Sequence, residues 1–240
     1  MSVQDRNPEY KADQRQVFDE MISEDWHTYL TPESVGLWKY EARLLLGRLT
    51  MKDIAVLDVG CGCGFHDYEM ALSPKVKSIR AIDYSPKSIE RARQEFAHGK
   101  IDFEVDDIFQ MRPDGAYDLV VSFQVIEHLE DPQVFLEQLR DFCKPGGMLG
   151  IFTVDRMRPY NRIRARYDKA PELDDPMHKR EFVMEELEQM GKTAGMETVF
   201  RCKYAAGPTK WIPSCWRPAM GRLFPHLGTR LFILLRRSEK

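Results

Sequence analysis

The sequence contains no apolar run near the roughly 18 residues that a membrane-crossing helix needs, and it carries no secretory signal. It also lacks a strong net charge: the formal value is −3 for 240 residues, which gives no overall attraction to nucleic acid or to an anionic membrane. Its five cysteines are an odd number, which favours reduced thiols over a disulfide framework. These absences predict a cytoplasmic protein that does not bind nucleic acid.

Internal repeats, low-complexity tracts and linkers are absent as well. With 43% apolar and 30% charged residues, the composition is that of a soluble globular protein. A chain of this length can bury a sizeable core, so we expect one domain.

Residues 56–64 are the most informative stretch, because an apolar run leads directly into a turn with glycine at every second position. The three glycines are Gly60, Gly62 and Gly64. Glycine has no Cβ, so it adopts positive φ readily and lets a ligand approach main-chain N–H groups. A helix beginning at Phe65 would direct its positive end to the same place. The turn therefore predicts a site where the backbone contacts a nucleotide.

Two cysteines, Cys61 and Cys63, lie inside this turn, and such a pair resembles half of a metal-binding site. No second Cys or His pair at ligand spacing completes such a site. We therefore interpret both as small turn residues and predict no bound metal.

Strands and helices alternate along the chain. We expect core strands at 54–59, 76–83, 101–105, 117–123 and 148–154, with helices after Thr31-Pro32, at 65–72, from Pro86 toward Gly99 and from Asp131-Pro132 to Lys144. A late helix at 182–194 and strands at 197–204 and 230–235 complete the pattern. Such alternation with short connections predicts a doubly wound α/β fold, a parallel sheet with helices on both faces.

Polar side chains gather where these strands end. Asp83 ends the second strand, Asp106 and Asp107 follow the third, and residues 124–128 follow the fourth. Ligands of open α/β sheets bind beyond the carboxyl ends of the strands. We therefore expect these residues and the glycine turn to form one site.

Six short motifs together carry a resemblance to a known family. They are Asp58-Val59-Gly60-Cys61-Gly62-Cys63-Gly64, Ile82-Asp83-Tyr84-Ser85, Val105-Asp106-Asp107-Ile108, Tyr117-Asp118-Leu119-Val120, Val125-Ile126-Glu127-His128-Leu129 and Lys144-Pro145-Gly146-Gly147. In this order, over residues 50–155, the chain resembles the class I S-adenosylmethionine-dependent methyltransferases, in particular the branch that acts on small molecules, lipids and quinone-type rings. The resemblance implies S-adenosylmethionine as cofactor and a Rossmann-like seven-stranded sheet, mostly parallel with an antiparallel last strand.

The resemblance also implies roles for single residues. Asp58 and the glycine turn would face the methionine part of the cofactor, Asp83 would accept hydrogen bonds from both ribose hydroxyls, and Asp106 would accept one from the adenine amino group. A diol, an amino group and a sulfonium cation all suit carboxylate acceptors. The expected cofactor-binding residues are Asp58, Gly60, Cys61, Gly62, Gly64, Asp83, Tyr84, Asp106, Asp107, Ile108, Phe123 and Gln124.

Two alternatives use the same elements. A dinucleotide-dependent oxidoreductase would carry Gly-x-Gly-x-x-Gly, whereas position 65 is Phe, and it would not explain the later motifs. A non-catalytic module of the same fold would tend to lack a candidate base and a substrate cover.

His128 and His178 are the expected catalytic residues. His128 directly follows the fourth strand at the cofactor edge, and His178 precedes the late helix. If the acceptor is a hydroxyl, one of them would remove its proton, whereas a carbon or amine acceptor needs no such base. We expect methyl transfer to a small or lipid-like acceptor, with a hydroxyl favoured over carbon or nitrogen.

Substrate contacts are expected outside the cofactor core. Residues 156–167 contain five arginines and no acid, and a helix starting at Pro159 would place Tyr160, Ile163 and Tyr167 on one face. The expected substrate-binding residues are Arg158, Arg162, Arg166, Trp211 and Trp216. The arginines would face an anionic group of the substrate or an anionic membrane surface, or else form a solvated face.

The domain plan follows from these assignments. We expect one methyltransferase domain over 1–240: a helical cap at 1–50, the cofactor core at 51–155, a substrate-cover loop at 156–182, and the rest of the sheet at 183–240 with a lid insertion at 207–228. The expected partner is a small or lipid-like molecule, with peripheral membrane contact as a further option.

Overall fold

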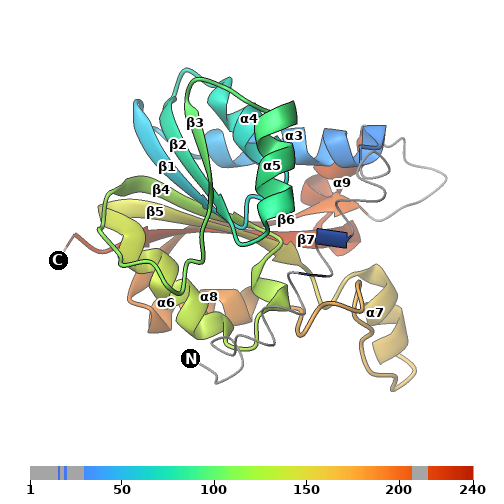
Figure 1. The fold of residues 1–240 in the computed structure, drawn as a ribbon. Coiled ribbons are helices and arrows are strands. Elements are labelled where there is room, and N and C mark those ends of the chain that lie inside the picture. The colour runs from blue at the N-terminus through green and yellow to red at the C-terminus, as the bar shows by residue number, and fades with distance from the viewer. Residues whose placement is uncertain (1–15, 17–18, 21–29, 207–215, 240) are drawn as a thin grey trace.

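A seven-stranded β-sheet forms the centre of the computed structural model, which describes residues 16, 19–20, 30–206 and 216–239 (Figure 1). The strands are β1 (Ile54–Val59), β2 (Val76–Asp83), β3 (Ile101–Val105), β4 (Tyr117–Phe123), β5 (Cys143–Val154), β6 (Met196–Ala206) and β7 (Gly228–Arg237). Their order is β3-β2-β1-β4-β5-β7-β6. Strands β1 to β5 run parallel, and β7 lies antiparallel to both β5 and β6. The predicted Rossmann-like sheet, with its antiparallel last strand, is confirmed.

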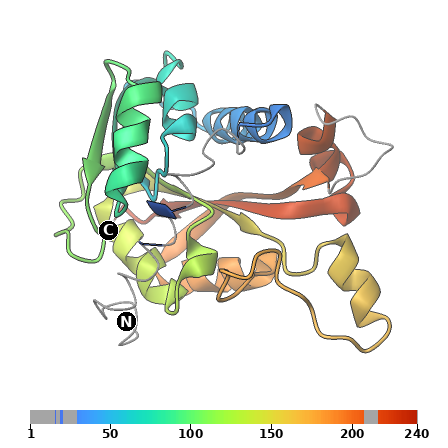
Figure 2. The same ribbon diagram turned by 45° about the vertical axis from the view of Figure 1, so that its right-hand side comes forward.

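Helices cover both faces of this sheet (Figure 2). They are α3 (Pro32–Leu46), α4 (Phe65–Ala71), α5 (Pro86–Glu95), α6 (Pro132–Phe142), α7 (Pro159–Ala165), α8 (Met184–Thr193) and α9 (Arg217–Leu223). Helices α3, α4 and α5 lie on one face and α6 and α8 on the other, and each face has its own apolar core. In the part of the chain that the structure describes, no helix is long and apolar enough to cross a membrane.

The helices begin where the sequence predicts, because side chains satisfy their first N–H groups. Ser85 Oγ accepts a hydrogen bond from the N–H of Ser88 (3.1 Å), and Asp131 Oδ1 accepts one from the N–H of Val134 (3.2 Å). A proline then occupies the first helical position, where no N–H partner is needed. The Ser85 cap starts α5 directly after the carboxyl end of β2, and the Asp131 cap starts α6 after the turn that follows β4.

Other boundaries differ from the prediction for identifiable reasons. The late helix begins at Met184 instead of residue 182, because Phe182 forms a bridge with Asp155 and its carbonyl accepts the N–H of Arg156 (2.8 Å). Strand β5 begins at Cys143 instead of 148, because Cys143 pairs with Tyr117 of β4. Helix α5 stops short of the predicted end, at residue 95.

The glycine turn between β1 and α4 supplies a test of the fold. Gly64 has φ +83°, and a Cβ there would lie 2.5 Å from Cζ of Phe103, whereas Gly62 has φ +53° and nothing within 4 Å of its Cβ position. Gly64→Ala should lower the free energy of unfolding by about 2–5 kcal/mol, since it adds a clash to left-handed strain, and Gly62→Ala by about 1–2 kcal/mol, from strain alone. Urea denaturation measures both values, and equal losses would contradict this account of the turn.

Candidate active site

The glycine turn is fixed by its neighbours at the carboxyl edge of the sheet. The N–H groups of Gly60 and Cys61 both donate to the carbonyl of Ile82 in β2 (2.8 and 3.0 Å). A Cβ on Gly60 would lie 2.4 Å from Cγ2 of Val125, so only glycine lets the turn lie against the segment that follows β4. The segments after β1, β2 and β4 therefore meet at this edge, as the sequence predicts.

Asp83 ends β2 and holds the turn from the other side. Its two carboxylate oxygens accept the N–H groups of Gly62 and Ser85, each at 2.9 Å. Burial raises the pKa of Asp83 to about 6, against these hydrogen bonds, which lower it. Each carboxylate oxygen can accept a second hydrogen bond, so the residue retains capacity for hydroxyl donors of a ligand.

Two buried carboxyls lie beneath the turn, and one of them was not predicted. Asp58 of β1 and Asp67 of α4 are both fully buried and hydrogen-bond to each other, and no other side chain among the described residues donates to their oxygens. Burial, followed by the charge of Asp67, raises the pKa of Asp58 well above its usual range, and burial raises the pKa of Asp67 to about 7. An uncompensated acidic pair of this kind suits a positively charged ligand group.

The segment after β3 adjoins Asp83. The N–H of Asp106 donates to the carbonyl of Asp83 (3.1 Å), while Asp106 Oδ1 accepts the N–H of Asp107 (2.9 Å). Asp106 Oδ2 lies 3.4 Å from Nη2 of Arg80, and Ile108 is buried in the core under α6. The structure thus brings the expected residues after β2 and β3 together with the glycine turn, and Tyr84 directly follows Asp83.

The end of β4 carries an unusual backbone conformation. Gln124 has φ +56°, which non-glycine residues adopt at a cost, and its side-chain oxygen accepts a hydrogen bond from Arg230 of β7. The ring of Phe123 stacks between those of Phe152 (4.6 Å between centroids) and His66 (3.8 Å). This apolar stack fixes the strand end from which the next residues turn toward the site.

A buried polar network lies behind Phe123, and no sequence motif indicated it. His66 Nε2 lies 2.7 Å from Oε2 of Glu41 in α3, and the hydroxyl of Tyr204 in β6 donates to Oε1 of the same Glu41 (2.6 Å). Glu41 and Tyr204 are both buried. The network ties the helical cap to the far edge of the sheet.

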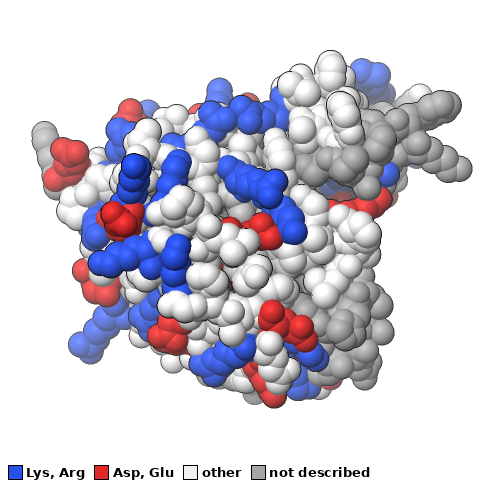
Figure 3. All heavy atoms as spheres, turned by 90° about the horizontal axis from the view of Figure 1, so that it is seen from above, with Lys and Arg blue, Asp and Glu red and all other residues white. Residues whose placement is uncertain are grey.

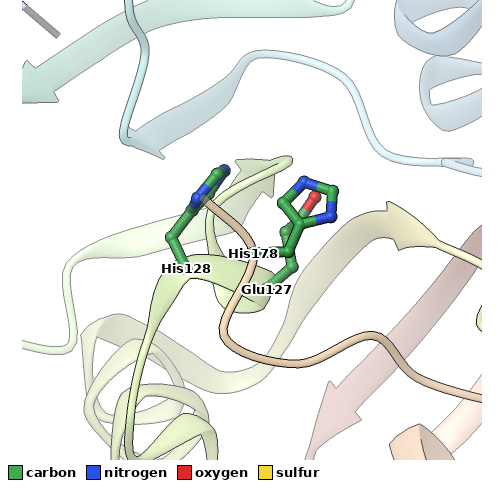
Figure 4. Close-up of side chains that lie close together, drawn as sticks. All are labelled: Glu127, His128 and His178. Atoms are coloured by element: carbon green, nitrogen blue, oxygen red, sulfur yellow. The ribbon is translucent and has the colours of Figure 1, made fainter. Parts of the chain in front are cut away.

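The two expected catalytic histidines lie side by side (Figure 4). The ring centroids of His128 and His178 are 4.9 Å apart in an edge-to-face arrangement. Burial, and after it the neighbouring His178, lowers the pKa of His128, which keeps this imidazole neutral near pH 7. Nδ1 of His178 lies 3.1 Å from Oε1 of Glu181.

Glu127 lies beside these histidines, although no role was predicted for it from the sequence. Its carboxylate is fully buried, and burial raises its pKa. Oε2 accepts a hydrogen bond from Thr153 (2.8 Å), whereas Oε1 has no hydrogen-bond donor among the described residues. The signal that could have indicated it is an acid at the start of a helical turn in an otherwise apolar segment.

The arginine segment forms the predicted short helix, α7, but the arginines differ in their environment. Arg158 is buried and pairs with Glu181 (2.6 Å) and Asp174 (3.4 Å), so it holds the cover loop together instead of pointing outward. Arg162 is half-buried and Arg166 is exposed. We therefore restrict the expected anionic contact to these last two.

The side chains of α7 and of the residues after it differ in whether they face the protein or the solvent. Tyr160, Ile163 and Tyr167 are exposed in the structure, because the side chain of α7 that packs inward is Asn161. Asn161 donates to the carbonyls of Arg156 (2.7 Å) and Glu172 (2.8 Å), and these bonds orient the helix. The face that Tyr160, Ile163 and Tyr167 share is therefore exposed to solvent.

The predicted lid at 207–228 is described only from residue 216 onward, where α9 lies beside β6. Trp216 is exposed, and Trp211 lies outside the described residues.

Seen from above, Lys and Arg side chains are interspersed with Asp and Glu over the described surface of the molecule (Figure 3).

Comparison with known proteins identifies related sequences. A family model described as a methyltransferase domain matches residues 50–201, more than half of the chain. A Mycolicibacterium smegmatis protein named "Probable S-adenosylmethionine-dependent methyltransferase" is 29% identical over 143 residues, which cover 59% of this chain and 51% of that protein. The ubiquinone biosynthesis O-methyltransferase of Caulobacter vibrioides is 33% identical over 113 residues, 45% of this chain and 44% of that protein. The chain thus spans about half the length of these curated relatives.

Solved structures show the same fold. The N-methyltransferase NodS from Bradyrhizobium japonicum, in complex with S-adenosyl-L-homocysteine, superposes with a TM-score of 0.62 at 19% identity. The superposition covers 93% of this chain and 97% of NodS. At this identity the likeness concerns the fold alone.

The acidic pair under the turn gives a pH-dependent test. The folded-state pKa of Asp67, about 7, lies above the value of about 3.9 expected in the unfolded chain, so its contribution to stability is present below pH 4 and is lost as the pH rises through 7. Without ligand, Asp67→Asn should therefore be more stable than the native protein at pH 8, by on the order of 3 kcal/mol, with the difference vanishing near pH 4. Thermal and urea unfolding at both pH values measure this.

The matched control is Asp102→Asn, since Asp102 is exposed on β3. This variant should follow the native protein at every pH. A native protein that is more stable than Asp67→Asn at pH 8 would rule out an uncompensated acidic pair.

Proposed function

Because the chain belongs to the S-adenosylmethionine-dependent methyltransferase family, as the match over residues 50–201 shows, we propose that it transfers a methyl group to the hydroxyl of a small-molecule acceptor. S-adenosylmethionine is the methyl donor of this family. The observation that carries the proposal is one edge of the sheet where the buried acids Asp58 and Asp67 lie under the glycine turn, and where His128, after β4, contacts His178 of the cover loop. This edge offers a place for a cationic donor beside groups that can activate an acceptor.

The residues present fit the expected cofactor. When bound, S-adenosylmethionine supplies an electrophilic methyl group on a sulfonium cation. Within the described part of the chain, the buried carboxyls of Asp58 and Asp67 have no cationic partner, and a positively charged methionine moiety would provide one. Asp83 keeps lone pairs for the ribose hydroxyls, and Asp106 at the neighbouring strand end is the proposed acceptor for the adenine amino group.

The remaining cofactor contacts are proposed from position. They are Phe123, which ends β4, and residues in the segments that follow β1 to β4: Gly60, Cys61, Gly62, Gly64, Tyr84, Asp107, Ile108 and Gln124. The glycine positions matter most, since their positive φ values would strain any other residue and the missing Cβ atoms let a ligand approach the turn closely.

His128 and His178 are proposed to activate the acceptor hydroxyl. A neutral imidazole can take or share a proton, and the lowered pKa of His128 keeps it neutral. The hydroxyl acceptor is supported by the similarity to a ubiquinone biosynthesis O-methyltransferase over part of the chain. Nitrogen or carbon acceptors would not need these histidines.

The acceptor is proposed to be ring- or lipid-like with an anionic group. Arg162 of α7 and Arg166, which directly follows α7, would provide the charge. Trp216 is exposed and would provide aromatic surface, and Trp211, which lies outside the described residues, is proposed with it from the sequence alone. An anionic membrane surface is the second partner that these side chains would fit.

The compartment is proposed from the cysteines. The described cysteines are free thiols, which supports a reducing compartment such as the cytoplasm.

Cofactor binding is tested at Asp83. Asp83→Ala should weaken S-adenosylmethionine binding by about 2–4 kcal/mol, because two hydroxyl donors lose a charged acceptor. Isothermal calorimetry measures the affinity, with Asp102→Ala as the control that should bind like the native chain. Tight binding of NAD, or full affinity in a folded Asp83→Ala variant, would refute the cofactor assignment.

Acceptor activation is tested at His128. His128→Ala should lower kcat about 10²–10⁴-fold while cofactor affinity stays intact, because the lost group acts on the hydroxyl proton. The assay follows label from the methyl-labelled cofactor into a small-molecule extract. His226→Ala, at an exposed histidine, is the control. Lost cofactor affinity with an unchanged single-turnover rate would instead place His128 in the cofactor wall.

The anionic contact is tested with a double variant, Arg162→Gln with Arg166→Gln, which spares the buried ion pair of Arg158. Its KM for the acceptor should rise roughly tenfold or more, since a charge-assisted hydrogen bond is lost. Arg201→Gln, on β6, serves as the control. Salt-dependent loss of liposome binding would favour the membrane instead, and no change in either assay would leave these arginines as a solvated face.

A further inference from the structure

Glu127, His128 and His178 each carry a side-chain atom that can bind a metal ion, and these atoms lie close together. One ligand atom of each lies within 4.8 Å of the other two, and this is the one group of three or more potential metal ligands found among the described residues. Figure 4 shows the three side chains gathered at one place, with the Glu127 carboxylate next to the ring of His178. Such a separation is short enough for one cation to contact all three after small rotations of the side chains.

The imidazole rings are oriented by their Nδ1 atoms. Nδ1 of His178 lies 3.1 Å from the carboxylate of Glu181, and Nδ1 of His128 lies 3.3 Å from the carbonyl of Met177. Carboxylate and carbonyl oxygens accept hydrogen bonds, so Nδ1 carries the proton in the neutral form of each ring, and Nε2 is then the atom that can bind a metal. Histidines that bind metals in proteins are held in this way.

Glu181 is itself fixed as a partner for His178. Its Oε2 accepts Nη1 of the buried Arg158 (2.6 Å), and Oε1 accepts the N–H of Asp174. The anionic Glu181 therefore keeps the proton of His178 on Nδ1.

Glu127 supplies the observation that points to a cation. Its carboxylate is fully buried, and Oε1 has no hydrogen-bond donor among the described residues. A buried carboxylate without compensation is costly, and a metal ion next to it would remove that cost.

The backbone also holds the two halves of the cluster together. The carbonyl of Glu127 accepts the N–H groups of Lys179 (2.8 Å) and Arg180 (3.2 Å), the two residues that follow His178. The turn after β4 and the cover loop are thus joined beside the three side chains. The ligands come from two rigidly connected segments, as a preformed metal site requires.

We propose that Glu127, His128 and His178 bind one divalent cation of the zinc type, and that the acceptor oxygen occupies an open coordination position of this ion. Two imidazoles and one carboxylate form a donor set typical of catalytic zinc, which leaves a position for water or substrate. The role in methyl transfer rests on the function proposed above, and it restricts the acceptor to molecules with a hydroxyl that can ligate a metal. Bound to the cation, the hydroxyl ionises more easily: its O–H bond breaks, the electron pair stays on oxygen, and the proton passes to water.

This proposal departs from the sequence, which predicted no metal. The prediction considered the cysteines of the glycine turn, whereas the ligands proposed here come from two segments far apart in the chain. It also explains how two histidines can serve one hydroxyl, since both would act through the same ion.

Calorimetric titration with Zn²⁺ tests the site directly, on full-length protein without a polyhistidine tag and after treatment with a chelator. We expect one Zn²⁺ per chain. Glu127→Gln keeps the size of the side chain, and its affinity should fall at least 10–100-fold, as should that of His178→Ala. His226→Ala should bind like the native chain, because this histidine is exposed and outside the cluster.

Cobalt provides a second measurement. Co²⁺ bound by two imidazoles and a carboxylate should give visible absorption bands in the native protein that disappear in Glu127→Gln. Melting temperatures without metal show whether each variant is folded. Absence of stoichiometric Zn²⁺ binding, or equal binding by the native chain and a folded Glu127→Gln variant, would overturn the proposal.

The experiment separates this proposal from the proposed function. Titration of the chelated protein with S-adenosylmethionine shows whether the cofactor site works without metal. Cofactor binding with no Zn²⁺ binding would reject the metal site and keep the methyltransferase. Zn²⁺ binding with no cofactor binding would reject the methyltransferase, and with it the role of the ion in methyl transfer.

Discussion

Burial of carboxylates without cations is the constraint that the whole site depends on. Asp58, Asp67 and Glu127 are each fully buried at the carboxyl edge of the sheet, and burial raises the pKa of all three. A chain selected for stability alone would replace them with apolar residues, since uncompensated buried charge is costly. Their presence is explained if ligands complete the site, a cationic cofactor under the glycine turn and a metal ion at the histidines.

The fold brings these groups together through few contacts. Parallel strands end at one edge, the glycine turn is tied to β2 by the carbonyl of Ile82, and its close approach to Val125 brings it next to the segment with the histidines. The cover loop joins the same edge through the backbone of Glu127 and the buried pair of Arg158 and Glu181. The glycine turn, where we propose that the methyl donor binds, and the histidines, where we propose that the acceptor binds, are therefore held at fixed positions by backbone contacts. Methyl transfer depends on such alignment of donor and acceptor.

The sequence predicted what depends on local order. Glycine at alternate positions, acids at strand ends and caps such as Ser85 are visible in the chain because each acts within a few residues, and the fold followed from their alternation. Asp67, and the link from Glu41 to Tyr204, depend on which helix face meets the sheet, which no local pattern specifies. The buried face of α7 could not be predicted locally either, because it is determined by the hydrogen bonds of Asn161. Likewise, the ion pair of Arg158 with Glu181 joins residues that are 23 positions apart in the chain.

The most direct measurement of the central claim is the proton balance of cofactor binding. Calorimetric titration with S-adenosylmethionine between pH 5.5 and 7, in two buffers of different ionisation enthalpy, gives both the affinity and the protons released. Burial raises the pKa of Asp83 to about 6 and that of Asp67 to about 7, so both carboxyls are partly protonated in this pH range. If the site binds a cationic cofactor, binding favours the ionised carboxylates. The affinity for S-adenosylmethionine should therefore rise with pH, and protons should be released on binding. An affinity independent of pH, with no proton released, would contradict it.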